Sequence, residues 1–82
     1  MKLIIRNLTR STTEEEIKAL FQGYGTVQSC DLVLDKITGG SKGFAFVEMP
    51  KPGEAKAAMK NLNSMILAGN KIRVKKAEDK TD

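Results

Sequence analysis

Hydrophobic and polar positions recur along the chain with two different periods. In four short stretches apolar residues alternate with polar ones, or cluster as Val and Leu, which is typical of β-strands. In two other stretches they recur at i, i+3 and i+4, the spacing of one buried helix face. The predicted strands cover residues 2–6, 27–34, 43–49 and 71–75, and the predicted helices cover residues 13–22 and 51–62. The pattern therefore predicts the element order β-α-β-β-α-β.

Each predicted helix has a start signal and a single apolar stripe. Thr13 and Glu16 are spaced for a capping box, and Pro52 suits the first turn of the second helix. The stripe residues are Ile17, Leu20 and Phe21 in the first helix, and Ala55, Ala58, Met59 and Leu62 in the second. Because each helix has only one stripe, we expect each to bury one side against a sheet.

The element order predicts an α+β, ferredoxin-like fold, with two helices on one face of a four-stranded antiparallel sheet. We expect one domain over residues 1–77, followed by a short charged tail at residues 78–82. Residues 65–67 are a candidate hairpin edge before the last strand. Since both helices lie on one face, the other face stays open to solvent, and its side chains decide function.

Composition narrows the function classes. The chain has 82 residues, of which 40% are hydrophobic and 29% charged, a globular composition with a formal net charge of +4. The charge suits an anionic partner. There is no His and only one Cys, Cys30, so Ser–His or Cys–His catalysis, a zinc site and an internal disulfide lack their residues. We predict no catalytic residue, cofactor, metal site or membrane segment, and we expect a soluble, cytoplasmic monomer.

The outward positions of the predicted strands combine aromatic rings with cations. Phe44 and Phe46 lie at i and i+2 on the same side of the third strand, where water is expected. Six basic residues accompany them on the outward side: Lys2, Arg6, Lys42, Lys71, Arg73 and Lys75. Rings that stack on bases and cations that meet phosphates are the combination used for single-stranded nucleic acids. Double helices hide their base faces, so the pattern favours unpaired strands.

Two plainer explanations compete with this interpretation. Phe44 and Phe46 could belong to the core if the third strand were buried on both faces, although the chain is too short to cover both faces of the sheet. The basic residues alone could be an ordinary solvated surface.

Residues 42–49, Lys-Gly-Phe-Ala-Phe-Val-Glu-Met, resemble the eight-residue signature of the RNA recognition motif family, departing from it only at Met49. Residues 3–8, Leu-Ile-Ile-Arg-Asn-Leu, resemble its six-residue companion on the first strand. The resemblance covers residues 2–77. It implies binding of single-stranded RNA, with single-stranded DNA as an open alternative. A chain with one such domain also resembles small bacterial RNA-binding proteins of the family, although a fragment of a longer protein is the alternative.

The resemblance also implies roles on the third and last strands. Phe46 would stack on a base, Phe44 would pack against sugars or between two nucleotides, and Lys42 would pair with a phosphate. Arg73 and Lys75, with the segment running to residue 77, would touch bases or backbone.

Two first-strand positions depart from the family pattern. Ile4 stands where the family has a stacking aromatic, so it can give only an apolar contact. Arg6 stands where a small residue is common, and it could contact a phosphate, stack on a base or be a surface charge. The missing ring at Ile4 keeps a protein-interaction domain on the same fold as the alternative function. An acylphosphatase-like enzyme would need a Gly-rich phosphate loop after the first strand, and residues 7–13 lack one.

Overall fold

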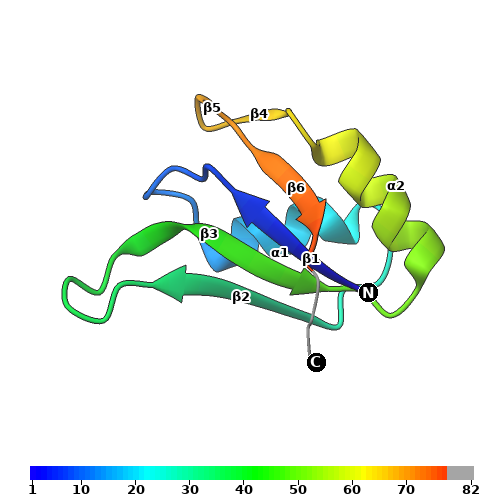
Figure 1. Ribbon diagram of the computed structural model, residues 1–82, viewed down its shortest axis with the longest axis horizontal. Helices are drawn as coiled ribbons and strands as arrows, with labels where there is room; N and C mark the ends of the chain where they lie inside the picture. The colour runs from blue at the N-terminus through cyan, green and yellow to red at the C-terminus, as the bar shows by residue number, and fades with distance from the viewer. Residues whose placement is uncertain (78–82) are drawn as a thin grey trace.

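The computed structural model describes residues 1–77, and the predicted charged tail at 78–82 lies outside the described residues. The elements follow the predicted order, with one addition before the last strand (Figure 1). They are β1 (Lys2–Arg6), α1 (Glu14–Gln22), β2 (Ser29–Leu34), β3 (Ser41–Glu48), α2 (Pro52–Leu62), β4 (Ile66–Leu67), β5 (Asn70–Lys71) and β6 (Arg73–Lys76). Within residues 1–77, no helix combines the length and the apolar content that a membrane span requires.

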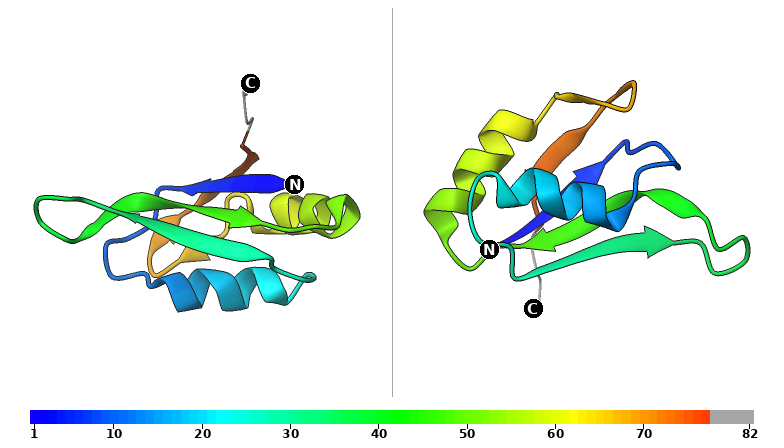
Figure 2. Two further views of the ribbon diagram at one scale, coloured as in Figure 1. Left: turned by 90° about the horizontal axis from the view of Figure 1, so that it is seen from below. Right: turned by 180° about the vertical axis from the view of Figure 1, so that it is seen from behind.

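The four long strands form one antiparallel sheet in the order β2-β3-β1-β6. Both helices cover the same face of this sheet, as the two views of Figure 2 show. The central strands are β3 and β1, so the residues on these two strands have neighbours on both sides. The α+β, ferredoxin-like fold predicted from the sequence is confirmed.

The core lies between the sheet and the two helices. The inward side chains of the central strands, among them Leu3, Ile5 and Val47, are fully buried. The helix stripes meet them as predicted, through buried Ile17, Phe21, Ala55, Ala58 and Leu62, with Leu20 and Met59 partly buried against the cluster. The alternation on β1 and β3 therefore assigns every second residue to the core and leaves the others to the open face.

The start of α1 is fixed by its predicted capping box. The Thr13 hydroxyl accepts from the Glu16 backbone N–H (3.2 Å), and the Glu16 carboxylate accepts from the Thr13 N–H (2.9 Å). Glu14, the first residue of α1, also contacts the sheet, because its carboxylate accepts the backbone N–H of Leu32 at 2.9 Å. Leu32 lies on the sheet-edge strand β2, so this bond satisfies a donor that an exposed edge would leave free.

The predicted last strand, residues 71–75, is corrected by the structure. Lys71 belongs to β5, which pairs with β4 in a separate two-stranded hairpin, and the sheet strand β6 begins only at Arg73. The two-residue hairpin turn is made by Ala68 (φ 52°) and Gly69 (φ 88°). Both residues are left-handed, which gives the turn a twist that matches the twist of the strands it joins. The hairpin edge expected at residues 65–67 is confirmed as β4, and β5 takes the first residue of the predicted strand.

Candidate nucleic-acid interface

Phe44 and Phe46 stand on the open face of the central strand β3. Ala45 and Val47 between and beyond them are fully buried, whereas both Phe side chains are partly exposed. The two ring centroids lie 6.0 Å apart and the rings meet edge to face at 87°. The possibility that both rings belong to a second core is therefore wrong. The rings form a partly exposed aromatic pair in the middle of the sheet.

Phe46 has a different neighbour on each side. Ile4 of β1 lies directly opposite it on one side, and Asp31 of β2 lies directly opposite it on the other. The Lys2 ammonium stands over the Phe46 ring, 5.1 Å from its centroid, within the range of a cation–π interaction. In the free domain a movable cation therefore occupies the ring face on which a base would stack.

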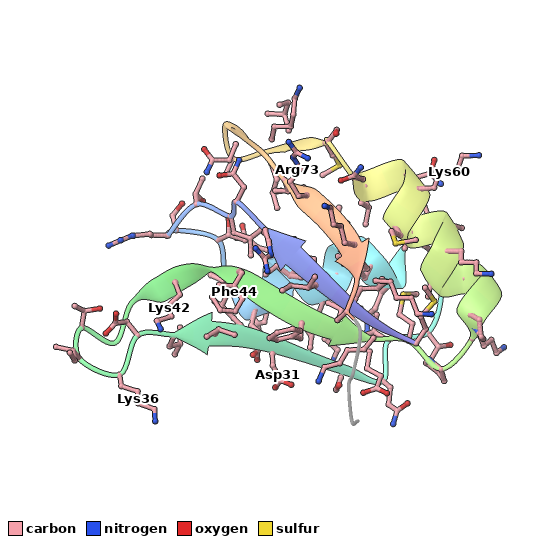
Figure 3. The ribbon with its side chains drawn as sticks, in the orientation of Figure 1. Asp31, Lys36, Lys42, Phe44, Lys60 and Arg73 are labelled. Carbon is pink, nitrogen blue, oxygen red and sulfur yellow. The ribbon has the colours of Figure 1, made fainter. Side chains whose placement is uncertain are left out.

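Basic side chains gather on the β1–β6 half of the open face. Arg6 and Arg73 are direct cross-strand partners, and Lys75 lies opposite Ile4. All three basic residues are exposed. Figure 3 shows Arg73 and Asp31 on opposite sides of Phe44. Like charges directly opposite each other are unfavourable in a sheet, so an anion bound between Arg6 and Arg73 would reduce their repulsion.

Acidic side chains lie on the other half. Asp31 is exposed on β2, and Glu48 ends β3 opposite Lys2 of β1 and Ser29 of β2. The open face is therefore divided across the sheet: cations along β1 and β6, aromatic rings on β3 and carboxylates toward β2.

Three hollows follow one another along this face, with volumes of about 370, 500 and 400 Å³. The first is lined by Arg6, Asn7, Leu8, Lys42, Gly43 and Phe44. The second is lined by Ile4, Arg6, Phe46, Lys75, Lys76 and Ala77. The third is lined by Arg10, Asp35, Thr38, Ser41, Lys42 and Phe44. Neighbouring hollows share Arg6, or Lys42 and Phe44, so together they make a track from the β2–β3 loop to the end of β6.

Gly43 is required by the close packing at the start of this track. Its φ of 88° is in the left-handed region, and a Cβ there would lie 3.2 Å from the Leu8 carbonyl oxygen. Its own carbonyl accepts the Leu8 backbone N–H at 2.9 Å, which ties β3 to the loop after β1. The eight-residue signature therefore needs a glycine at this position for a local structural reason. The preceding residue, Lys42, is exposed.

The structure brings eight of the nine predicted site residues to the open face or its hollows. They are Lys2, Ile4, Arg6, Lys42, Phe44, Phe46, Arg73 and Lys75. Lys71 is the exception: it was predicted to lie in the last strand of the sheet, whereas its strand β5 pairs with β4. The Lys71 carbonyl accepts from the Asn7 side-chain amide at 2.8 Å, so its backbone anchors the hairpin to the loop after β1.

The track also contains polar residues that were not among the predicted site residues, including Asn7, Lys76 and Arg10. Asn7 has φ 63°, and Asn is enriched at left-handed positions, so its place directly after a strand was a usable signal. Lys76 extends β6 by one residue and lines the second hollow. Arg10 lines the third hollow together with residues of the β2–β3 hairpin, and nothing next to Arg10 in the sequence indicates this.

The β2–β3 loop is held by Asp35. Its carboxylate accepts the backbone N–H groups of Ile37 (2.7 Å) and Thr38 (3.2 Å). These two hydrogen bonds are the main cause that lowers the pKa of Asp35, and the charges of Lys42 and Arg10 lower it further. The loop therefore keeps a fixed turn beside the third hollow while Ile37 stays almost fully exposed.

Cys30 is a packing residue on the inner side of β2. It is partly buried against the core, and its thiol lies 3.6 Å from the Glu14 carbonyl oxygen as a weak donor. Burial, with smaller contributions from the Glu14 and Asp31 carboxylates, raises its pKa from 9.0 to about 11. A thiol with this pKa is protonated at neutral pH, so Cys30 acts as a small, apolar packing group.

Known proteins resemble the chain in sequence and in fold. It is 42% identical to the human protein "Probable RNA-binding protein 19", over 96% of this chain and 8% of that protein. The crystal structure of "RNA Binding Protein PG1" superposes with a TM-score of 0.93 at 35% identity, over 100% of this chain and 99% of that one. A Sex-lethal protein/RNA complex superposes with a TM-score of 0.89 at 31% identity, over 94% of this chain and 46% of that one.

The chain spans less than a tenth of the length of the curated relatives that it matches, 8% of one and 9% of another. The family model described as "RNA recognition motif" matches residues 3–73, which include both signature segments, most of β1, all of β2 and β3, and the first residue of β6. The chain belongs to the RNA recognition motif family.

Proposed function

We propose that this domain binds single-stranded RNA, without catalysis, by stacking bases on Phe46 and Phe44 while the basic side chains of β1 and β6 contact phosphates. The observation that carries the proposal is the partly exposed aromatic pair on the central strand of an uncovered sheet face. Base–aromatic stacking contributes about 1–3 kcal/mol per ring, because every base has a π-face that an aromatic ring can contact.

Electrostatics supports the same ligand. Arg6 and Arg73 are direct partners across β1 and β6, and their mutual repulsion is relieved when a phosphate lies between them. Lys75 extends this half along the second hollow, next to the rim of Phe46. The phosphates therefore pass over β1 and β6, and the bases point toward β3.

The length of the track supports a short bound segment. The open face holds two rings and three consecutive hollows, which fits about two to four nucleotides if each ring or hollow takes one base or sugar. Two stacked rings give about 2–6 kcal/mol, so we expect dissociation constants between micromolar and millimolar before the electrostatic contribution.

The ligands named for similar proteins support RNA as the partner. One solved neighbour is a protein/RNA complex, and another is the Rna15 domain with bound RNA. We therefore favour RNA over single-stranded DNA for this chain. A protein-interaction domain is the alternative, and ligand binding confined to the helical side would favour it.

A comparison of single and double strands tests the proposal. Fluorescence anisotropy with a labelled random-sequence RNA heptamer should give saturable binding, and a self-complementary RNA duplex should bind at least about tenfold more weakly, because its bases are stacked inside the helix. Equal affinity for both ligands would mean that charge alone drives binding, and the stacking role of Phe44 and Phe46 would be wrong. Single-stranded DNA of the same composition is the matched competitor.

Three further expectations belong with this proposal. We expect a monomer, because the open face is used for a nucleic acid rather than for a second copy of the chain. We also expect a cytoplasmic protein, similar to small bacterial proteins that consist of one such domain. Light scattering of the purified chain, at concentrations up to those of the binding assays, tests the monomeric state, and a dimer would overturn it.

A further inference from the structure

The Phe46 ring is flanked by one acceptor and one donor. Asp31 lies directly opposite it on β2, and directly opposite residues on one sheet face have Cβ atoms about 4.5–5.5 Å apart. Lys2 reaches the same ring from β1, with its ammonium 5.1 Å from the centroid. A base that stacks on Phe46 would therefore have a carboxylate at one edge and an ammonium within reach of another.

Because the base and the ammonium compete for the same ring face, stacking moves Lys2 aside to the rim of the bound base. Two other neighbours of the ring cannot read a base edge. Ile4, opposite Phe46 on β1, is apolar, and Phe44 presents a ring at 87°. Arg6, Lys75 and Lys76 line the second hollow with Phe46 on the β6 side, where the phosphates are proposed to pass. Asp31 and Lys2 are therefore the polar groups left to distinguish one base from another at this position.

The four bases differ in what they offer to a carboxylate. Guanine presents two neighbouring donors, N1–H and the N2 amino group, which match the two oxygens of a carboxylate. Adenine and cytosine present one amino group beside a ring nitrogen acceptor, which repels a carboxylate. Uracil presents a single N3–H donor between two carbonyl acceptors. Guanine also presents O6 and N7 as acceptors for an ammonium, the contact that Lys makes with guanine in nucleic-acid complexes.

We propose that the Phe46 position selects guanine, with the Asp31 carboxylate accepting N1–H and N2–H and the Lys2 ammonium donating to O6 or N7. This inference rests on the proposed function, because it assigns the base that stacks on Phe46. It also gives the carboxylates of the β2 half a role: Asp31 reads a base, while the phosphates pass over the opposite half of the sheet.

Glu48 provides a matched control for Asp31. It is a carboxylate on the same face, but its cross-strand partners are Lys2 and Ser29 rather than Phe46. Asp31→Asn and Glu48→Gln each remove one negative charge and keep the size of the side chain. Glu48→Gln should strengthen binding of every oligonucleotide slightly, whereas Asp31→Asn should do so only for oligonucleotides without guanine at this position. Only Asp31→Asn should change which base is preferred.

The test measures the affinity of the whole chain for labelled RNA heptamers of uridine with guanosine, inosine, adenosine, cytidine or uridine at the central position. Wild type should bind the guanosine heptamer about tenfold more tightly than the all-uridine one. Inosine keeps N1–H and O6 but lacks the N2 amino group, so it should bind about threefold more weakly than guanosine. Asp31→Asn should reduce both differences to less than about twofold, and Glu48→Gln should retain them.

The outcomes separate the two proposals. Equal binding of all five heptamers by wild type would overturn guanine selection and leave RNA binding intact. A guanine preference that persists in Asp31→Asn, or that Glu48→Gln removes to the same extent, would also overturn the assignment of Asp31. If no heptamer binds wild type, the proposed function fails and guanine selection fails with it.

Discussion

The two faces of the sheet are built by the same strands and behave differently. On β1 and β3, the inward residues Leu3, Ile5 and Val47 are completely buried against the helices. Their immediate neighbours Ile4 and Phe46 are partly exposed on the other face. Because strand side chains alternate, adjacent residues in the sequence serve the core and the ligand separately. The stability of this domain and its binding can therefore be changed by substitutions one residue apart.

The largest expected effect lies on the covered face. Ile5→Ala removes a completely buried side chain from the centre of the core and should lower the free energy of unfolding by about 2–5 kcal/mol. Urea denaturation followed by circular dichroism measures this change. The neighbouring substitution Ile4→Ala is the control and should cost clearly less. Equal losses at the two positions would contradict the division between the faces.

The covered side of β2 offers a chemical test. Because the pKa of Cys30 is raised to about 11, its thiolate fraction at pH 8 is about 100-fold smaller than that of a thiol with the ordinary value of 9.0. Because a thiolate of higher pKa is also intrinsically more nucleophilic, alkylation by iodoacetamide at pH 8 should be about tenfold slower in the folded protein than in urea. Reaction at the same rate in both states would mean that Cys30 is not shielded.

The same shift predicts a pH dependence of stability. The folded chain keeps the Cys30 proton to a higher pH than the unfolded chain does. The stabilising contribution is therefore present below pH 9 and declines as the pH rises toward 11. Cys30→Ala should flatten this part of the stability profile, as measured by urea denaturation at a series of pH values. A profile that Cys30→Ala leaves unchanged would contradict the raised pKa.

On the open face, Phe46→Ala should weaken RNA binding by about 1–3 kcal/mol, on every sequence to which the ring contributes stacking. The protein should stay folded, because the side chain is outside the buried cluster. Anisotropy titration measures the affinity, and the amide spectrum verifies the fold. An unfolded Phe46→Ala protein would place the ring in the core and contradict the comparison.

The smallest effect concerns a single phosphate contact. Contacts with about three phosphates give a slope of about −2 for log affinity against log salt concentration, at about 0.7 per contact. Arg73→Ala should reduce the magnitude of this slope by about 0.7. Lys60→Ala removes an exposed cation of α2 on the helical side, far from Arg73 in Figure 3, and should leave the slope unchanged. Identical slopes for both variants would mean that the β1–β6 half has no special role.

Much of the fold could be predicted from local patterns. The capping box of Thr13 and Glu16 fixed the start of α1, and alternation placed Phe44 and Phe46 on the face opposite Val47. These inferences succeeded because each depends on residues at most four positions apart.

The wrong and the missed predictions depend on contacts between residues that are far apart in the sequence. Lys71 was assigned to the sheet because it alternates with Arg73, but the turn at Ala68 and Gly69 diverts it into the β4–β5 hairpin. Ala is unusual at a positive φ, so Ala68 did not indicate a turn at this position. The position of Asp31 directly opposite Phe46 follows from strand register, which no single segment of the sequence specifies. That Arg10 and Lys42 line the same hollow depends on how the loop after β1 lies against the β2–β3 hairpin.

An amide chemical-shift titration with a pool of short random RNA oligomers tests the central claim most directly, because it reports both faces of the sheet at once. The account predicts shifts centred on Phe44, Phe46 and Arg73, with α1 and α2 almost unaffected. Shifts confined to the two helices would contradict it and would indicate that the uncovered face of the sheet is not the binding surface.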